Sequence, residues 1–224
     1  MKDYLFLLFV LTQFTIYSQE NMKKDWPNFK KYATENESIS TSPSFTNTIV
    51  FMGDSITEFW KVNDPDFFSS NNFIDRGISG QTTPQMLLRF RQDVINLKPS
   101  TVIILAGIND IAENTGPITI EQIMGNIISM VELAKSNKIK VILCSVLPAN
   151  KFSWNPKLQP ADKVIQLNQM IATYATKNKI TYVDYYTAMV DEHKGLQKKY
   201  GEDGVHPNLE GYKVMEELLL RFLK

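Results

Sequence analysis

Short apolar runs alternate with longer amphipathic segments along the 224-residue chain, and this alternation limits the possible folds more than any other feature. The run Thr101–Ala106 is apolar on both faces, as a strand must be when helices cover each side of its sheet. Five such runs are predicted to be strands: Thr48–Met52, Phe73–Arg76, Thr101–Ala106, Lys140–Ser145 and Ile180–Asp184.

Helical segments are predicted between these strands and after the last one. They fall at Thr83–Phe90, Ile120–Asn137, Ala161–Lys179 and Asn208–Leu223, with a shorter helical turn at Ile56–Trp60. Strands that alternate with helices form a parallel sheet. The predicted fold class is therefore α/β, a three-layer α/β/α sandwich with a five-stranded parallel sheet, flavodoxin-like in its arrangement.

The first residues read as a separate unit. Leu5–Ile16 is apolar, follows Lys2, and ends close to Ser18, a small residue that suits a cleavage site. The stretch is too short and too interrupted to cross a bilayer comfortably, so residues 1–19 are predicted to be a secretory signal peptide. An uncleaved anchor is the alternative. Residues 20–224 would then form one domain, exported to the periplasm or outside the cell, with no stable membrane insertion.

The segment between this leader and the first strand is polar. Over Asn21–Glu37, the residues Trp26, Phe29 and Tyr32 recur at helix spacing, which predicts a mostly helical lead-in. Ser38–Asn47 is rich in Ser, Thr and Pro, and is predicted to be a loop that enters the core.

Charge and cysteine content narrow the functional classes. The chain has 24 basic and 24 acidic residues, so its zero net charge gives no electrostatic reason to expect nucleic acid as a partner. Cys144 is the single cysteine, which excludes an intramolecular disulfide and a cysteine-rich metal site. Because it lies in an apolar run, Cys144 is predicted to be a buried thiol.

The ends of the predicted strands carry glycine beside polar residues. In open parallel sheets, ligands bind outside the carboxyl ends of the strands. Three such ends carry this pattern: Gly53-Asp54-Ser55, Gly77-Ile78-Ser79-Gly80 and Gly107-Ile108-Asn109-Asp110. We expect the functional residues at this edge.

A histidine base is the next element, and the chain has only two histidines. His193 lies in a charged stretch typical of solvated surface. His206 follows Asp203 through a glycine turn just before the last helix. A carboxylate at this spacing can accept the Nδ1 proton and leave Nε2 as a base, although Asp203 could instead cap a helix.

Ser55 follows the first strand at a strand-to-helix turn, which exposes its hydroxyl and places its N–H at the positive end of a helix. The alternative is that Ser55 only caps that helix. Gly80 offers a backbone N–H and Asn109 a side-chain NH₂ as donors for an oxyanion. Alternatively, these two residues serve only their own turns.

In this order, the blocks around Ser55, Gly80, Asn109 and Asp203–His206 resemble the four sequence blocks of the SGNH/GDSL hydrolase family. The resemblance covers essentially all of residues 20–224, with Ile56 where the family name would have leucine. It implies the SGNH hydrolase fold and a serine esterase that needs no cofactor and no metal. By this resemblance Ser55 is the nucleophile, His206 the base and Asp203 its orienting carboxylate, while the Ser55 N–H, Gly80 and Asn109 form the oxyanion hole.

The predicted substrate is a small-molecule or glycan ester that loses a short acyl group, such as acetyl. Asp54, next to the nucleophile, is predicted to contact this substrate. Phe152 and Trp154, in a long segment after the fourth strand, are predicted to be exposed and to stack on a sugar ring or line an acyl pocket. The alternative is that the two aromatic residues only cover the sheet edge.

Other functions remain open. A lysophospholipase or thioesterase would use the same residues on another acyl group. A non-catalytic glycan- or flavin-binding flavodoxin-like protein would share the fold, although the chain lacks Gly-x-Gly-x-x-Gly and the phosphate loop. The absence of Gly-x-Ser-x-Gly argues against an α/β-hydrolase. The oligomeric state is left open.

Overall fold

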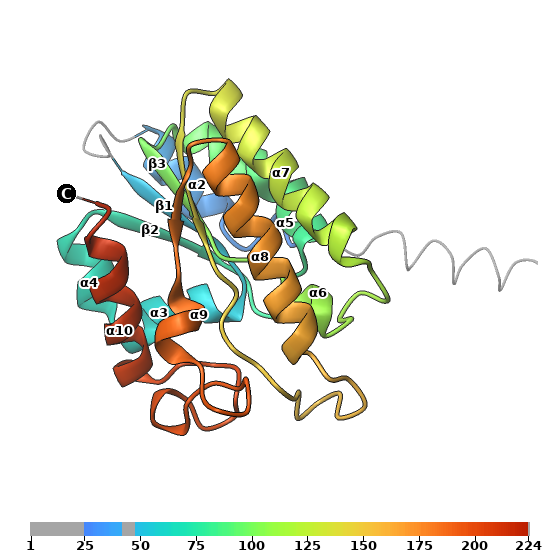
Figure 1. Cartoon of the computed structure of the whole chain (residues 1–224). Helices are drawn as coiled ribbons and strands as arrows, with labels where there is room; N and C mark the ends of the chain where they lie inside the picture. Colours follow the sequence, from blue (N-terminus) through green and yellow to red (C-terminus); the bar gives the residue numbers. More distant parts are fainter. Residues whose placement is uncertain (1–24, 42–47, 224) are drawn as a thin grey trace, which may run out of the picture.

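Five parallel strands form one sheet in the order β2-β1-β3-β4-β5 in the computed structural model of the chain. The structure describes residues 25–41 and 48–223. Helices cover both faces of the sheet, so the molecule has three layers (Figure 1). The predicted α/β/α sandwich with a five-stranded parallel sheet is therefore confirmed.

The five predicted strands are all present, with small shifts at their ends. They are β1 (Ile49–Gly53), β2 (Phe73–Gly77), β3 (Thr101–Ile104), β4 (Lys140–Cys144) and β5 (Thr181–Val183). Every residue of β3 is buried, because helices lie on both sides of it. Cys144 is 2% exposed, so the prediction of a buried thiol is confirmed.

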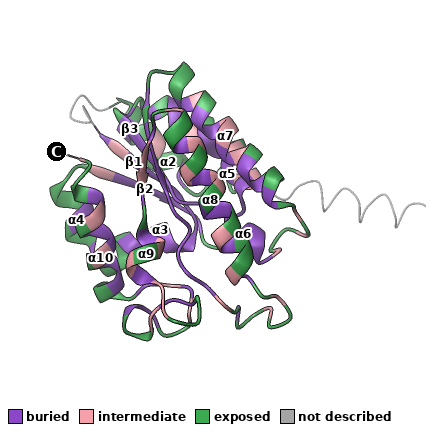
Figure 2. Ribbon diagram, in the orientation of Figure 1, coloured by how far each residue is buried: buried purple, intermediate pink, exposed green. Residues whose placement is uncertain are grey.

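Two groups of helices sandwich the sheet (Figure 1). On one side lie α5 (Thr83–Asp93), α7 (Ile120–Ser136) and α8 (Ala161–Lys177). On the other lie α3 (Ser55–Asn63), α4 (Pro65–Ser70) and α10 (Leu209–Leu220). Their buried residues face the sheet and their exposed residues face outward (Figure 2). The long helices match their predicted ranges because each carries an apolar stripe at helical period.

Short helices are the elements that the sequence analysis did not anticipate. They are α4, α6 (Ile108–Ile111) and α9 (Tyr185–Met189). Helices this short are not stable alone in water, so tertiary contacts must hold them, and they contain too few residues to show a clear period.

The lead-in to the first strand differs from the prediction. Asp25–Tyr32 forms turns, and helix α2 spans only Ala33–Thr41. The Asp25 carboxylate accepts the N–H groups of Phe29 and Lys30 at 2.9 and 3.0 Å, which closes a turn. Asn28 adopts a left-handed φ of 56°, which interrupts a helix. The predicted helix over Asn21–Glu37 is therefore wrong over Asp25–Tyr32 and confirmed over Ala33–Glu37.

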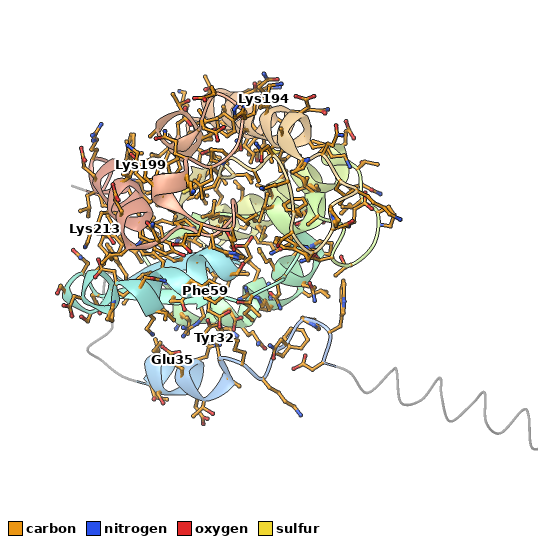
Figure 3. All side chains as sticks on the ribbon, turned by 90° about the horizontal axis from the view of Figure 1, so that it is seen from below. Tyr32, Glu35, Phe59, Lys194, Lys199 and Lys213 are labelled. Carbon is orange, nitrogen blue, oxygen red and sulfur yellow. The ribbon has the colours of Figure 1, made fainter. Side chains whose placement is uncertain are left out.

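The aromatic residues of this segment consequently point in different directions. Trp26 and Phe29 are exposed, whereas Tyr32 is buried between the lead-in and the rest of the molecule (Figure 3). The Tyr32 hydroxyl donates to the Gly77 carbonyl at the end of β2. This bond ties the lead-in to the carboxyl edge of the sheet.

Some predictions fall on residues outside the described ranges. The leader at residues 1–19 is one of them, as is the second half of the Ser38–Asn47 loop, whose first residues belong to α2. Among the helices that the structure describes, none has the length and apolar content needed to cross a membrane.

Candidate active site

Ser55 is the first residue of α3 and directly follows β1 and Asp54. The turn before it is tight, because a Cβ on Gly53 would lie only 2.0 Å from Thr57 Oγ1. Asp54 caps the helix by accepting the Ile56 N–H at 2.9 Å. The alternative in which Ser55 itself caps the helix is therefore wrong, and its hydroxyl is left for another partner.

That partner is a histidine from the far end of the chain. His206 Nε2 lies 2.8 Å from Ser55 Oγ, across a separation of 151 residues. On the other side of the ring, His206 Nδ1 lies 2.6 Å from Asp203 Oδ2. Ser55 is 6% exposed, whereas the His206 side chain is 25% exposed. The structure thus brings together the three residues that the sequence suggested as a triad.

The Asp203 carboxylate is held by its own turn. Its Oδ1 accepts the backbone N–H groups of Val205 and His206 at 2.9 and 2.8 Å. Burial raises the pKa of Asp203, but these bonds and the His206 ring outweigh it and keep the pKa below its ordinary value. Asn208 caps α10 by accepting the Gly211 N–H, so the helix-cap alternative for Asp203 is wrong.

Helix α10 packs on α3 and so positions the turn that carries His206. The Tyr212 hydroxyl donates to the Ile56 carbonyl at 2.8 Å, and its ring stacks on Trp60 with centroids 5.5 Å apart. Trp60 Nε1 in turn donates to Glu216 at 3.1 Å. Because Trp60 and Tyr212 are almost fully buried, these contacts fix the two helices against each other.

Gly80 lies in the turn after β2. Its φ is 77°, a left-handed conformation that glycine adopts without strain. The neighbouring Ser79 donates both its N–H and its hydroxyl to Glu58 Oε2 on α3, at 2.7 Å each. Glu58 is itself paired with Lys31. The turn is thereby fastened to the helix that begins with Ser55.

Asn109 lies in α6, after β3. Its Nδ2 donates to the Gln81 carbonyl at 3.1 Å, and its Oδ1 accepts from Asn114 Nδ2 at 2.9 Å. The neighbouring Asp110 accepts the N–H and the hydroxyl of Thr83 at 2.9 and 2.6 Å. Burial raises the pKa of Asp110 to about 6. These bonds pin the loops after β2 and β3 together.

Ser55, Gly80, Asn109 and His206 all line one cavity of about 310 Å³. It is lined by Ser55, Phe59, Ser79, Gly80, Asn109, Asn114, Trp154 and His206. A hydroxyl that is bonded to an imidazole, itself oriented by a carboxylate, is an arrangement that can act as a nucleophile. Amide donors beside that hydroxyl can stabilise an oxyanion.

Three residues of the cavity were not among the predicted site residues: Phe59, Ser79 and Asn114. The ring centroids of Phe59 and His206 lie 5.3 Å apart. Phe59 is four residues after Ser55, so the two side chains share one face of the helix, and this spacing could have predicted that Phe59 lies at the site. Asn114 orients the Asn109 amide, but it follows the unpredicted helix α6, so nothing in the sequence pointed its side chain back toward Asn109.

The two aromatic residues of the loop after β4 differ in solvent exposure. Trp154 is 46% exposed, lines the cavity and donates its Nε1–H to Asn114 at 3.3 Å. Phe152 is 0% exposed and does not line the cavity, so the prediction that its side chain is exposed is wrong. The loop turns the Phe152 ring into the hydrophobic core, against Trp154 at 5.0 Å between centroids.

Asp54, which was predicted to contact the substrate, is also buried. It is 1% exposed and is not among the residues that line the cavity, so nothing in the structure supports the predicted contact with substrate. Its carboxylate is turned toward the Ile56 N–H, because that group needs a cap. Burial raises the pKa of Asp54 to about 7, against the opposing effects of this bond and of His206.

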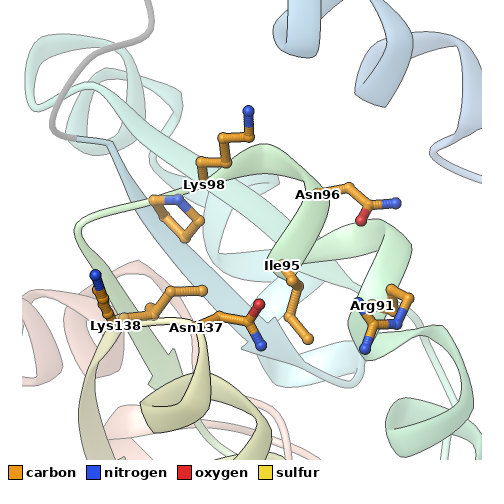
Figure 4. Close-up of a pocket in the computed structure, with 8 residues that line it drawn as sticks. Arg91, Ile95, Asn96, Lys98, Asn137 and Lys138 are labelled. Carbon is orange, nitrogen blue, oxygen red and sulfur yellow. The ribbon is translucent and has the colours of Figure 1, made fainter.

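A larger cavity of about 680 Å³ lies elsewhere (Figure 4). Lys98, Pro99, Lys138 and Ile139, which precede β3 and β4, line it, so it opens at the amino ends of these strands. It contains none of the predicted site residues. Among residues 25–41 and 48–223, no group of three or more His, Cys, Asp or Glu side chains is arranged to hold a metal ion.

Comparisons with known proteins identify the family of the chain. Residues 51–214 match the family described as GDSL-like lipase/acylhydrolase. A Bacteroides fragilis structure, proposed to be an acylhydrolase, is 51% identical with a TM-score of 0.87, covering 90% of this chain and 98% of that one. The structure of a GDSL-like lipase from Bacteroides thetaiotaomicron is 52% identical with a TM-score of 0.86, covering 89% and 98%.

Curated relatives are matched over shorter segments. An acetylxylan esterase of Xylanibacter ruminicola is 30% identical over 86 residues, which is 38% of this chain and 16% of that protein. The match to another curated relative covers 33% of its length. The chain therefore spans no more than about a third of these curated relatives.

Proposed function

The chain belongs to the GDSL-like lipase/acylhydrolase family and is a carboxylic ester hydrolase, and we propose that it is a serine esterase with Ser55 as nucleophile. We propose that it releases a short acyl group, such as acetyl, from a carbohydrate or another small alcohol. The observation that carries this proposal is the 2.8 Å separation of Ser55 Oγ from His206 Nε2.

In the proposed acylation step, His206 Nε2 takes the Ser55 proton while Ser55 Oγ attacks the ester carbonyl. The Asp203 carboxylate, 2.6 Å from Nδ1, holds the ring in the tautomer that leaves Nε2 unprotonated and stabilises the imidazolium that forms. His206 then gives the proton to the departing alcohol, and the acyl group stays on Ser55.

The oxyanion of this step is proposed to accept hydrogen bonds from the Ser55 N–H, the Gly80 N–H and the Asn109 side chain. Gly80 and Asn109 line the cavity of Ser55, and a bond from Asn109 Nδ2 to the Gln81 carbonyl holds their loops together. In the second step, His206 activates a water that attacks the acyl carbonyl and releases the acid.

The size of the cavity supports a short acyl group. At about 310 Å³ it lies at the lower end of ligand pockets, and the rings of Phe59 and Trp154 are part of its lining. A lysophospholipase or thioesterase with the same nucleophile would have to accommodate a longer chain there.

Two observations support a carbohydrate alcohol. The exposed indole of Trp154 lies in the lining of the cavity, where it offers an apolar face and is oriented by its hydrogen bond to Asn114. The relative from Xylanibacter ruminicola is named an acetylxylan esterase. We therefore take acetylated xylo-oligosaccharides as the first glycan substrates to test.

We also propose that residues 1–19 direct export and are removed, so that residues 20–224 act in the periplasm or outside the cell. The apolar Leu5–Ile16 stretch supports this proposal. Sequencing the N-terminus of the protein recovered outside the cytoplasm tests it, and an intact Met1 in that fraction would contradict it.

Covalent labelling tests the nucleophile. A fluorophosphonate probe should label the wild-type protein and should not label Ser55→Ala. Ser136→Ala is the matched control, because Ser136 is an exposed serine at the end of α7 and should leave labelling unchanged. Labelling of Ser55→Ala at the wild-type level would refute Ser55 as the nucleophile.

A series of p-nitrophenyl esters tests the acyl group. We expect the highest kcat/KM for acetate and a steady fall as the acyl chain lengthens. Acetylated xylo-oligosaccharides should also release acetate. Preference for long acyl chains, with no action on acetyl esters, would favour the lysophospholipase alternative.

A further inference from the structure

A further cavity, of about 580 Å³, is lined by residues next to those of the Ser55 cavity, and we call it the second cavity. It is lined by Trp26, Pro84, Thr115, Gly116, Pro117, Ile118, Gln122, Gly125, Asn126 and Ser129. None of these lining residues carries a charge. A cavity with an aromatic ring, amide and hydroxyl side chains and no charge suits a neutral polyhydroxy ligand better than an anion or a cation.

Residues that are neighbours along the chain line the two cavities, although no residue lines both. Asn114 lines the cavity of Ser55 and the next residues, Thr115 and Gly116, line the second one. Because successive Cα atoms are 3.8 Å apart, the Cα atoms of Asn114 and Gly116 are separated by no more than about 7.6 Å. On the other wall, Gly80 lines the first cavity and Pro84 the second.

These walls are cross-linked, so the second cavity has a fixed position relative to the first. The hydroxyl groups of Thr82 and Thr115 lie 3.1 Å apart. Asn126 Nδ2, from helix α7, donates to the Thr83 hydroxyl at 3.0 Å. That hydroxyl also donates to Asp110, which neighbours Asn109.

Trp26 and Pro27 are fastened to the same part of the chain. Gln85 Nε2 donates to the Trp26 carbonyl at 2.8 Å, and Gln81 Nε2 donates to the Pro27 carbonyl at 2.7 Å. Gln81 is also the residue whose carbonyl accepts from Asn109. The backbone of Trp26 is therefore bonded to α5, and that of Pro27 to the loop that carries Gly80 and bonds Asn109.

The indole of Trp26 is available to a ligand. It is 44% exposed, and within the described part of the chain its Nε1–H has no hydrogen-bond acceptor and its ring has no aromatic neighbour. An exposed tryptophan with an unused N–H offers both an apolar face and a donor, which matches the face and the hydroxyl groups of a sugar ring.

Gly125 provides an independent indication. It lies inside helix α7, where glycine is less stable than alanine. Its φ is not positive, and a Cβ added there would meet no atom within 4 Å. Neither backbone conformation nor packing therefore requires glycine at this position. What Gly125 does is leave open the space of the cavity that it lines.

We infer that this second cavity binds a sugar ring of a neutral oligosaccharide whose acetylated unit lies at Ser55. The inference rests on the proposed function, because it assumes that the alcohol part of the ester is a glycan. In this arrangement Trp26 stacks on a ring beyond the reacting unit, and the amide side chains of Gln122 and Asn126 face its hydroxyl groups. The cavity would make the enzyme favour oligomeric over monomeric esters.

The test compares a long and a minimal substrate. Kinetics are measured with acetylated xylohexaose and with p-nitrophenyl acetate, for wild type, Trp26→Ala and Gly125→Leu. We expect each variant to raise KM for the oligosaccharide about tenfold, with kcat and the hydrolysis of p-nitrophenyl acetate unchanged. Phe29→Ala is the matched control, an exposed aromatic residue of the same lead-in that does not line the cavity.

Gly125→Ala separates binding from folding. It should raise the melting temperature, because alanine is the better helix former, and it should still weaken binding of unacetylated xylohexaose measured by calorimetry. KM values for acetylated xylohexaose within twofold of wild type in both Trp26→Ala and Gly125→Leu would overturn the inference. An equal rise of KM for p-nitrophenyl acetate would overturn it as well.

The binding measurement also distinguishes this failure from failure of the proposed function. A wild-type protein that binds xylohexaose, and loses that binding in Trp26→Ala, supports the site even if no ester is cleaved. A wild-type protein that hydrolyses p-nitrophenyl acetate but does not bind xylohexaose refutes the site and leaves the esterase proposal intact.

Discussion

Replacement of Asn109 by alanine gives the sharpest test of the proposed oxyanion hole. The side-chain amide of Asn109 has two N–H groups, and one of them is used by the Gln81 carbonyl at 3.1 Å. One N–H therefore remains for the cavity that Asn109 lines together with Ser55. The amide cannot simply flip, because its Oδ1 accepts from Asn114 at 2.9 Å.

The expected magnitude follows from the loss of that single donor. Removing one oxyanion donor costs about 3 to 4 kcal/mol in the transition state, which corresponds to a fall in kcat of about 10² to 10³. The ground-state ester carbonyl gains little from the same donor, so KM should change far less than kcat. Asn114→Ala keeps the donor but loses its orientation, and should lower kcat by about tenfold or less.

The assay is steady-state hydrolysis of p-nitrophenyl acetate, with urea unfolding as the control. Asn109 is 4% exposed, so truncation also leaves the Gln81 carbonyl without its partner and should reduce the free energy of unfolding by about 1 to 3 kcal/mol. Activity is therefore compared under conditions in which both proteins are folded. A fall in kcat of less than about threefold would refute the role of Asn109 as an oxyanion donor.

Three further predictions follow from the same site. Asp203→Asn should lower kcat by up to about 10⁴, because the tautomer of His206 is no longer fixed. The rate of acylation is measured before the steady state, and a loss below about tenfold would contradict the role of Asp203 in orienting His206. Asp54 has a pKa raised by burial to about 7, so its contribution to stability is present below its ordinary pKa of 3.8 and is lost as pH rises through about 7. Urea unfolding across that range should show wild type losing stability relative to Asp54→Asn, and parallel curves would refute the argument. Phe152→Ala should lower the free energy of unfolding by about 3 to 5 kcal/mol and loosen Trp154, whereas a loss below about 1 kcal/mol would mean that Phe152 is not a core residue.

The sheet was predictable because its signal is local. Each central strand is apolar on both faces, a pattern that is visible within a few residues such as Thr101–Ala106. The short helices α6 and α9 were not predictable, because a helix of one turn is held by its surroundings and not by its own sequence. The prediction for the first part of the lead-in, Asp25–Tyr32, failed for a related reason, since Asp25 closes a turn where aromatic spacing indicated a helix.

The same distinction applies to the site. Asp203 and His206 are three residues apart, and a hydrogen bond between them can be inferred from that spacing and the glycine turn. The burial of Asp54 and Phe152 could not be inferred, because it depends on how neighbouring elements close over them. The structure therefore gives no support to their predicted contacts with substrate.

Local sequence was enough to predict the α/β order of the elements, the strand ends that carry Ser55, Gly80 and Asn109, and the pairing of Asp203 with His206. These features depend on residues that are close together along the chain. The remaining features depend on how distant segments pack. The tertiary structure brought Ser55 to His206 across 151 residues through the packing of α10 on α3, and it placed Trp26 beside the loop of Gly80. Contacts between distant segments are set by packing and hydrogen bonding of the whole molecule, and no short stretch of sequence encodes them.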